Sequence, residues 1–210
     1  IPKEDVDNIY LSMDELTALI ELDLSHEPRH DNIRDLFLIG CFTGLRVSDY
    51  NNLTSNSIKT VNRVKMILVK AQKTSKEVAI PLHPVVEKIL SKNNGNPPAR
   101  IPDQKINEGI KDICESAGID EVVYITHTKG GKKVTVKKYK FELVKTHTAR
   151  RSFCTNAYLS GMLPIDIMSI SGHTTEKSFL TYIKRTPEQT AIKMSQHPFF
   201  NGDNVNLKAV

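Results

Sequence analysis

Apolar side chains recur with a helical period through most of the chain. Ser12 and Glu15 have the spacing of a capping box, and Leu16, Leu19 and Ile20 behind them predict a helix to about residue 24. Further helices are expected over 31–42, over a short amphipathic stretch at 45–53, and over 84–92, 104–116, 146–158 and 164–172. A cap at Thr174 or Thr175 predicts one more helix, in which Phe179, Tyr182 and Ile183 would share a face.

Two regions show the shorter period that is typical of strands. Residues 58–61, 64–69 and 78–82 predict a small antiparallel sheet, and a polar turn over 70–77 carries three lysines. A second hairpin is expected from 122–128 and 132–141, turned by Gly130 and Gly131. The pattern therefore predicts a mainly α-helical protein with a small antiparallel β-sheet.

Composition and charge narrow the class of partner. The chain has 210 residues, of which 39% are hydrophobic, which suits one domain or two small ones. The formal net charge is +5, and six lysines gather within twelve residues that contain no acid: Lys129, Lys132, Lys133, Lys137, Lys138 and Lys140. This run favours a polyanionic partner, although a solvated hairpin explains it as well.

Three cysteines far apart in the sequence, Cys41, Cys114 and Cys154, indicate reduced thiols and a cytoplasmic protein. The sequence contains neither a signal peptide nor an apolar run of membrane-spanning length, so no membrane partner is expected.

Residues 26–30 match the H-E-x-x-H zinc pattern. That motif needs both histidines on one helical turn, and Pro28 can only begin a helix there, which leaves His26 outside it. A turn between helices is the better interpretation, and no metal or other cofactor is expected.

Residues 145–184 contain side chains that suit a phosphate. His147 and Arg150 would lie on one helical face, and guanidinium can bond two phosphate oxygens at once. His173 would stand on a loop between helices, behind Gly172. Taken alone, the first pair also fits a capped helix with a solvated basic start, and Tyr182 fits a core tyrosine as well as a nucleophile.

Four segments together resemble the catalytic signature of the tyrosine recombinases of the phage integrase family. They are T-G-L-R-V-S-D-Y around Arg46, K-T-S-K ahead of V-A-I-P-L, H-T-A-R-R-S-F, and S-G-H-T-T-E-K-S-F-L-T-Y. The resemblance covers about residues 10–200. It implies a mainly helical DNA breaking-rejoining domain with a small sheet at one edge, bound around double-stranded DNA.

The resemblance also implies a role for each matching residue. Arg46 and Arg150 would clamp the scissile phosphate, His173 would add a third donor, and His147 would help proton transfer from the nucleophile, Tyr182. Lys73 would be the general acid toward the leaving 5′-oxygen, with Lys76 as a less favoured substitute, and Asp49 would support the site. Further DNA contacts are expected from Lys76, Lys129, Lys132, Lys133 and Arg151.

The family's organisation suggests a linker or edge at 1–10, a catalytic domain at 11–200 and a tail at 201–210, with DNA-binding domains of the N-terminal region absent from this chain. A homotetramer on DNA is expected, with a monomer possible for the free fragment, and residues 191–200 would either dock on a neighbour or fold back. The resemblance also implies possible accessory DNA-bending proteins as partners and a cytoplasmic, nucleoid-associated location.

Three rival functions stay open at this point. A type IB topoisomerase shares the tyrosine and arginine chemistry, a non-catalytic DNA-binding regulator would need only the basic hairpin, and a zinc peptidase would use the motif at 26–30.

Overall fold

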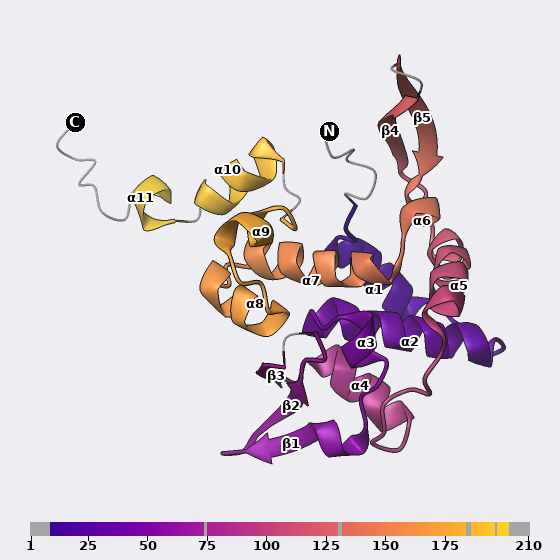
Figure 1. Cartoon of the computed structure of the whole chain (residues 1–210), viewed down its shortest axis with the longest axis vertical. Helices are drawn as coiled ribbons and strands as arrows, with labels where there is room; N and C mark the ends of the chain where they lie inside the picture. Colours follow the sequence, from indigo (N-terminus) through magenta and orange to yellow (C-terminus); the bar gives the residue numbers. More distant parts are fainter. Residues whose placement is uncertain (1–8, 74, 130–131, 184–185, 196, 202–210) are drawn as a thin grey trace.

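The computed structural model describes residues 9–201 except 74, 130–131, 184–185 and 196, and it is mainly helical with two small antiparallel sheets (Figure 1). The predicted fold class is confirmed. The elements follow the chain as α1 Met13–Glu21, α2 Pro28–Thr43, α3 Val47–Tyr50, a 3-10 turn Ser55–Ser57, β1 Ile58–Val61, β2 Val64–Lys70, β3 Glu77–Pro81, α4 Pro84–Lys92, α5 Asp103–Ser116, β4 Val122–Lys129, β5 Lys132–Tyr139, α6 Lys140–Leu143, α7 Thr146–Leu159, α8 Pro164–Ser171, α9 Glu176–Leu180, α10 Pro187–Ser195 and α11 Pro198–Asn201.

Helix α2 is the centre of the core. It begins at Pro28, three residues before the predicted start, because proline fits the first helical turn, where its missing amide has no partner to lose. Leu36, Phe37 and Ile39 are fully buried, and α7, α5 and α4 all pack on this helix.

Gly40 lets α2 and α7 approach closely. A Cβ atom at this position would lie 2.7 Å from the Tyr50 ring and 3.0 Å from the Cβ of Ala149 on α7. Because any side chain here would push the two helices apart, the glycine brings the carboxyl end of α2 against α7.

The three-stranded sheet has the order β1-β2-β3 and lies at one edge of the molecule (Figure 1). Ile67 on β2 is opposite Ile80 on β3, and both are buried, so one face of the sheet joins the core. The predicted antiparallel pairing is confirmed.

The second hairpin, β4–β5, projects away from the helices as a two-stranded arm (Figure 1). It pairs from Val122 with Tyr139 to Lys129 with Lys132, and the two predicted turn glycines lie outside the described residues. The predicted second strand was too long: Lys140 begins α6, is 9% exposed, and pairs with Glu15 and Glu121. One lysine of the basic run is thus part of the folded body.

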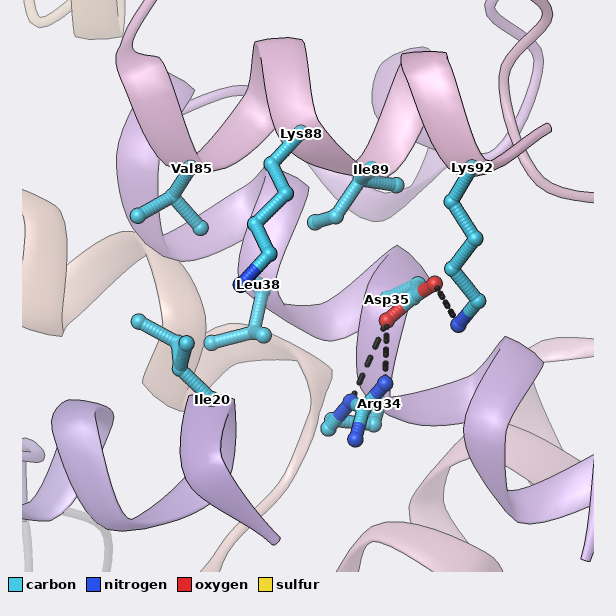
Figure 2. A pocket seen from close by; sticks show the side chains of 8 residues that line it. All are labelled: Ile20, Arg34, Asp35, Leu38, Val85, Lys88, Ile89 and Lys92. Atoms are coloured by element: carbon cyan, nitrogen blue, oxygen red, sulfur yellow. Dashed lines mark hydrogen bonds and ion pairs between the residues drawn. The ribbon is translucent and has the colours of Figure 1, made fainter. Parts of the chain in front are cut away.

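A buried ionic network joins α2 to α4 (Figure 2). Arg34 donates to Asp31, to Asp35 and to the carbonyl of Leu22, and Lys92 pairs with both carboxylates. Figure 2 shows Asp35 between the two cations. Each buried charge has an opposite charge beside it.

Several predicted boundaries are wrong by a few residues. Helix α1 ends at Glu21 rather than near residue 24, and Tyr182 lies on the turn after α9 rather than inside a helix. At the zinc-like motif, His26 lies in the turn before α2, and His30 pairs with Glu27. Among the described helices, none combines the length and the hydropathy needed to cross a membrane.

Candidate active site

The carboxyl end of α2 positions Arg46. Gly44 ends the helix in the left-handed conformation, with φ 65°, and a Cβ there would meet the Phe153 ring at 2.3 Å. Arg46 then caps α3 and reaches toward the α8–α9 connection, where its Nη1 lies 3.9 Å from the place that a Cβ of Gly172 would take. The turn therefore places Arg46 at the junction of α2, α7 and α8.

Helix α7 supplies His147 and Arg150, which share a face by their i, i+3 spacing. Arg150 is 3% exposed, and its guanidinium donates to the carbonyls of Gly44, at 2.7 Å, and Ser171. It ties the ends of α2 and α8 together. Two carbonyl bonds leave further N–H donors of the five on the guanidinium for another ligand.

The α8–α9 connection places His173 beside Arg150. Gly172 ends α8 with φ 64°, and the next residue turns its ring inward. The His173 Nδ1 atom lies 2.7 Å from the Ser171 Oγ, while the Nε2 atom is buried and has no hydrogen-bond partner in the described part of the chain. Burial, and then the positive charges of Arg150, Arg46 and His147, lower the pKa of His173 to about 4.

Tyr182 closes the group of side chains. Its ring centroid lies 4.4 Å from that of His173, 5.3 Å from that of His147 and 5.9 Å from the Arg150 Cζ atom. The Thr155 hydroxyl on α7 donates to the Tyr182 carbonyl at 3.1 Å. The turn after α9 is thereby fixed against α7.

The resulting cluster, defined as Arg46, His147, Arg150, His173 and Tyr182, contains two neighbouring arginines. Burial and the charge of Arg46 lower the pKa of the Arg150 guanidinium, which means that the two arginines repel each other. Neither arginine forms an ion pair with a carboxylate among the residues that the structure describes. Buried charges normally have a partner, so the cluster is suited to an anion from outside the chain.

Asp49 contacts the β2–β3 turn that carries Lys73. The Asp49 carboxylate is 7% exposed and accepts a hydrogen bond from the Gln72 amide at 3.0 Å, so it anchors the β2–β3 turn to α3. Lys73 follows on that turn with an exposed side chain, as does Lys76, whose carbonyl accepts from the Ala71 amide.

The other expected DNA contacts divide into two places. Lys132 is exposed on the projecting arm, and the side chains of Lys129 and Lys133 there lie outside the described ones. Arg151 instead approaches the Tyr182 ring, at 5.9 Å from its centroid, and the Arg151 Nε is buried with no partner among the described atoms. The structure thus brings Arg151 to the cluster.

Three contributors were missed at the level of sequence. They are the Gly44 carbonyl, the Thr155 hydroxyl and the Ser171 side chain, which hold Arg150, the Tyr182 backbone and His173 in place. The only signal for Ser171 was its position two residues before a histidine at a predicted helix end, and that pattern has no chemical meaning until the ring orientation is known. Among the described residues, no group of three or more metal-binding side chains is found.

Comparison with known proteins identifies the family and the fold of this chain. The model of the phage integrase family matches residues 10–189. The XerA recombinase structure superposes with a TM-score of 0.64 at 21% identity, covering 90% of this chain and 65% of that one. The XerH site-specific recombinase, in a post-cleavage complex with palindromic difH substrate, gives 0.60 at 18% identity, covering 93% and 53%.

The catalytic domain of bacteriophage HP1 integrase gives a TM-score of 0.55 at 18% identity, covering 91% of this chain and 96% of that one. No curated protein sequence matches significantly. The chain spans about half to two thirds of the two recombinases, and nearly all of the integrase catalytic domain. With a family match over most of its length and a shared fold, the chain belongs to the phage integrase family of tyrosine recombinases.

Proposed function

We propose that this chain is the catalytic domain of a site-specific DNA recombinase, an integrase of a mobile element, which cleaves and rejoins DNA strands through a covalent 3′-phosphotyrosyl intermediate. One observation carries the proposal. The phenol of Tyr182 lies among two arginines and two histidines, and neither arginine has a carboxylate partner in the described part of the chain.

The scissile phosphate would occupy the space that the two arginines face. Arg46 and Arg150 bond its non-bridging oxygens, where negative charge grows in the transition state, and His173 adds a third contact. Removing one such donor typically costs about 2.7–4 kcal/mol of transition-state stabilisation. The Arg150 guanidinium is already held in place by two carbonyls.

The strand is cut by attack of the Tyr182 oxygen on phosphorus. The phenol proton leaves with the help of His147, the bond to the 5′-oxygen breaks, and Lys73 protonates that oxygen. A phenol with a reference pKa of about 10 needs such cations nearby to become a nucleophile.

Lys73 is exposed in the free protein, so it reaches the leaving oxygen only when the turn anchored by Asp49 lies over bound DNA, with Lys76 as the substitute. Because one phosphate ester replaces another of similar energy, the strand is rejoined without ATP or a metal ion.

The partner is double-stranded DNA. The arm lysines Lys129, Lys132 and Lys133 neutralise backbone phosphates, and Arg151 acts at the cut site. Exposed apolar side chains on α10 and α11, among them Ile192, Phe199 and Phe200, suit docking on a neighbouring protomer in a homotetramer on DNA. DNA-binding domains and DNA-bending proteins from outside this chain would complete the assembly at the nucleoid.

Covalent trapping tests the proposal without knowledge of the target site. The protein is mixed with a pool of nicked duplexes of random sequence, in which the short fragment released by cleavage diffuses away. We expect a slower protein band that carries DNA, and sequencing the trapped strands reports the site. Joining of strands between two duplexes distinguishes recombination from relaxation of supercoils.

The variant Tyr182→Phe must abolish the adduct, because it lacks only the attacking oxygen. Tyr158→Phe on α7 is the matched control, since its ring packs against Lys193 and lies outside the cluster. An adduct that persists in Tyr182→Phe, or one that also disappears in Tyr158→Phe, contradicts the assignment of the nucleophile.

A further inference from the structure

Ser171 is the last residue of α8 and contacts the only protonatable ring on the α8–α9 connection. It is 1% exposed. Its Oγ lies 2.6 Å from the carbonyl oxygen of Ile167, one helical turn back, and 2.7 Å from the His173 Nδ1. The same hydroxyl therefore has two close partners of different kinds.

The protons of these contacts can be counted. A carbonyl oxygen only accepts, and two oxygens at 2.6 Å need a hydrogen between them, so the single hydroxyl hydrogen of Ser171 lies toward Ile167. The Ser171 oxygen can then only accept from His173, which requires hydrogen on Nδ1. In a neutral imidazole the other nitrogen is then bare.

We propose that Ser171 is a positioning residue that holds the neutral His173 ring in its Nδ1–H tautomer, so that Nε2 faces the cluster as a proton acceptor until an anion arrives. The buried, unpartnered state of Nε2 among the described residues agrees with this. In histidines generally, the hydrogen bond made by one ring nitrogen determines whether the other nitrogen carries a proton.

The groups around the ring keep it neutral. From α7 it faces Arg150 and His147, from the start of α3 Arg46, and from the turn after α9 Tyr182. Burial and the cations hold its pKa near 4. Cys154 on α7 stays a thiol at neutral pH, since burial raises its pKa to about 11.

An arriving phosphodiester changes this balance, and here the inference rests on the proposed function. A negative charge beside Nε2 offsets the repulsion from the arginines, so the ring takes one proton from solvent and becomes a donor to a phosphate oxygen. His173 is thus a contact that is switched on by its substrate. Anion binding must then be accompanied by the uptake of one proton.

Nitrogen NMR of protein labelled in its histidines tests the tautomer directly in the free, full chain. Long-range proton–nitrogen correlations distinguish Nδ1–H from Nε2–H and from the imidazolium. We expect the Nδ1–H pattern for His173 at neutral pH. An Nε2–H ring or a charged ring in the wild-type protein overturns the proposal, whatever the outcome of covalent trapping.

Three variants separate positioning from structure. Ser171→Ala leaves Nδ1 without its acceptor, and the ring should shift toward Nε2–H, whereas Ser171→Thr keeps a hydroxyl and should keep the tautomer. Ser169→Ala on the same helix removes a hydroxyl that donates to Asp166 but is exposed and does not touch His173, so it should change nothing. A Ser171→Ala ring that stays Nδ1–H overturns the role of the serine.

Dimethyl phosphate, a small phosphodiester anion, tests the proton uptake. In wild-type protein its affinity should fall by about tenfold per pH unit between the pKa of the free ring, about 4, and the higher pKa of the bound ring, because one proton is taken up on binding in that range. In Ser171→Ala this dependence should flatten, since an Nε2–H ring donates without gaining a proton. A pH-independent affinity in the wild-type protein contradicts the linked uptake, while the tautomer measurement still decides the position of the proton. If Ser171→Ala does not fold, the wild-type tautomer and pH dependence suffice.

Discussion

Two buried arginines in this molecule have opposite surroundings. Arg34, on α2, is 8% exposed and lies between Asp31 and Asp35, with Lys92 completing a network of two positive and two negative charges. Figure 2 shows Arg34, Asp35 and Lys92 of this network. Arg150, on α7, is 3% exposed, and its partners are two carbonyl oxygens, with Arg46 nearby as a second positive charge.

The difference separates a structural charge from a functional one. Moving a charge out of water is costly unless an opposite charge replaces the lost hydration. The Arg34 network meets that need within the fold, and both of its carboxylates are already occupied. The Arg150 cluster has no such carboxylate among the described residues, so part of its desolvation cost is offset only when an anion binds.

The largest effect expected from this comparison is on stability. Arg34→Met leaves Asp31 and Asp35 with less compensation, and removing one partner of a buried ion pair typically costs about 3–5 kcal/mol of unfolding free energy. Arg150→Met should cost less, about 1–2 kcal/mol, because the lost carbonyl bonds are partly offset by relief of the repulsion from Arg46. Urea denaturation of both variants measures this, and equal losses would contradict the distinction.

For DNA cleavage, substitution of Arg150 should have a larger effect than substitution of Arg34. Arg150→Lys keeps the charge but loses the planar fork, and we expect covalent DNA cleavage to fall by about 10²–10³-fold. Arg34→Lys serves as the matched control and should cleave at the wild-type rate wherever it is folded. The measurement is single-turnover formation of the DNA adduct.

Anions should raise the unfolding free energy through the Arg150 cluster and not through the Arg34 network. Inorganic phosphate at a hundredfold excess over its dissociation constant should add about 2.7 kcal/mol to the unfolding free energy through the Arg150 cluster. Arg46→Gln should lose this gain, and sodium chloride of equal ionic strength provides the control. A gain that is unchanged in the variant would place the anion elsewhere.

The pH dependence of stability should report on His173. Its pKa is about 4 in the folded protein against 6.5 normally, so the unfolded chain binds the extra proton first. Its contribution is therefore complete above about pH 6.5 and is lost as the pH falls toward 4, by about 1–2 kcal/mol, because partial exposure weakens the effect. Thermal unfolding of His173→Gln across this range should show a smaller slope than wild type. Added phosphate should flatten the wild-type slope.

The smallest effects are expected on the arm. Lys132→Gln should lower DNA affinity by less than about 1 kcal/mol at any sequence, and it should reduce the salt slope of binding by about one. Lys140→Gln, eight residues later in the same basic run, should instead lower stability, since its ammonium pairs with Glu15 and Glu121. Filter binding at several salt concentrations and thermal unfolding distinguish the two lysines.

Local signals in the sequence located most of the helices and both hairpins. The capping box at Ser12, Pro84 at a helix start, and Gly44 and Gly172 at helix ends all act within one turn of the chain, so a short stretch of sequence is enough to recognise them. The end of β5 was predicted wrongly because a distant group contacts it. Strand β5 ends at Tyr139 because Lys140 donates a hydrogen bond to Glu15, which is 125 residues distant in the sequence.

The sequence by itself determined which chemical groups are present: a tyrosine, two arginines and two histidines in segments typical of one family, and a basic hairpin. Only the tertiary structure decided that two arginines and two histidines meet around Tyr182, that Arg151 joins them, that the Lys73 side chain is exposed in the free protein, and that Ser171 contacts His173. The physical reason is the separation along the chain over which each interaction acts. Caps and periodicity act over a few residues, whereas desolvation and the position of a proton depend on atoms that folding brings together from remote parts of the chain.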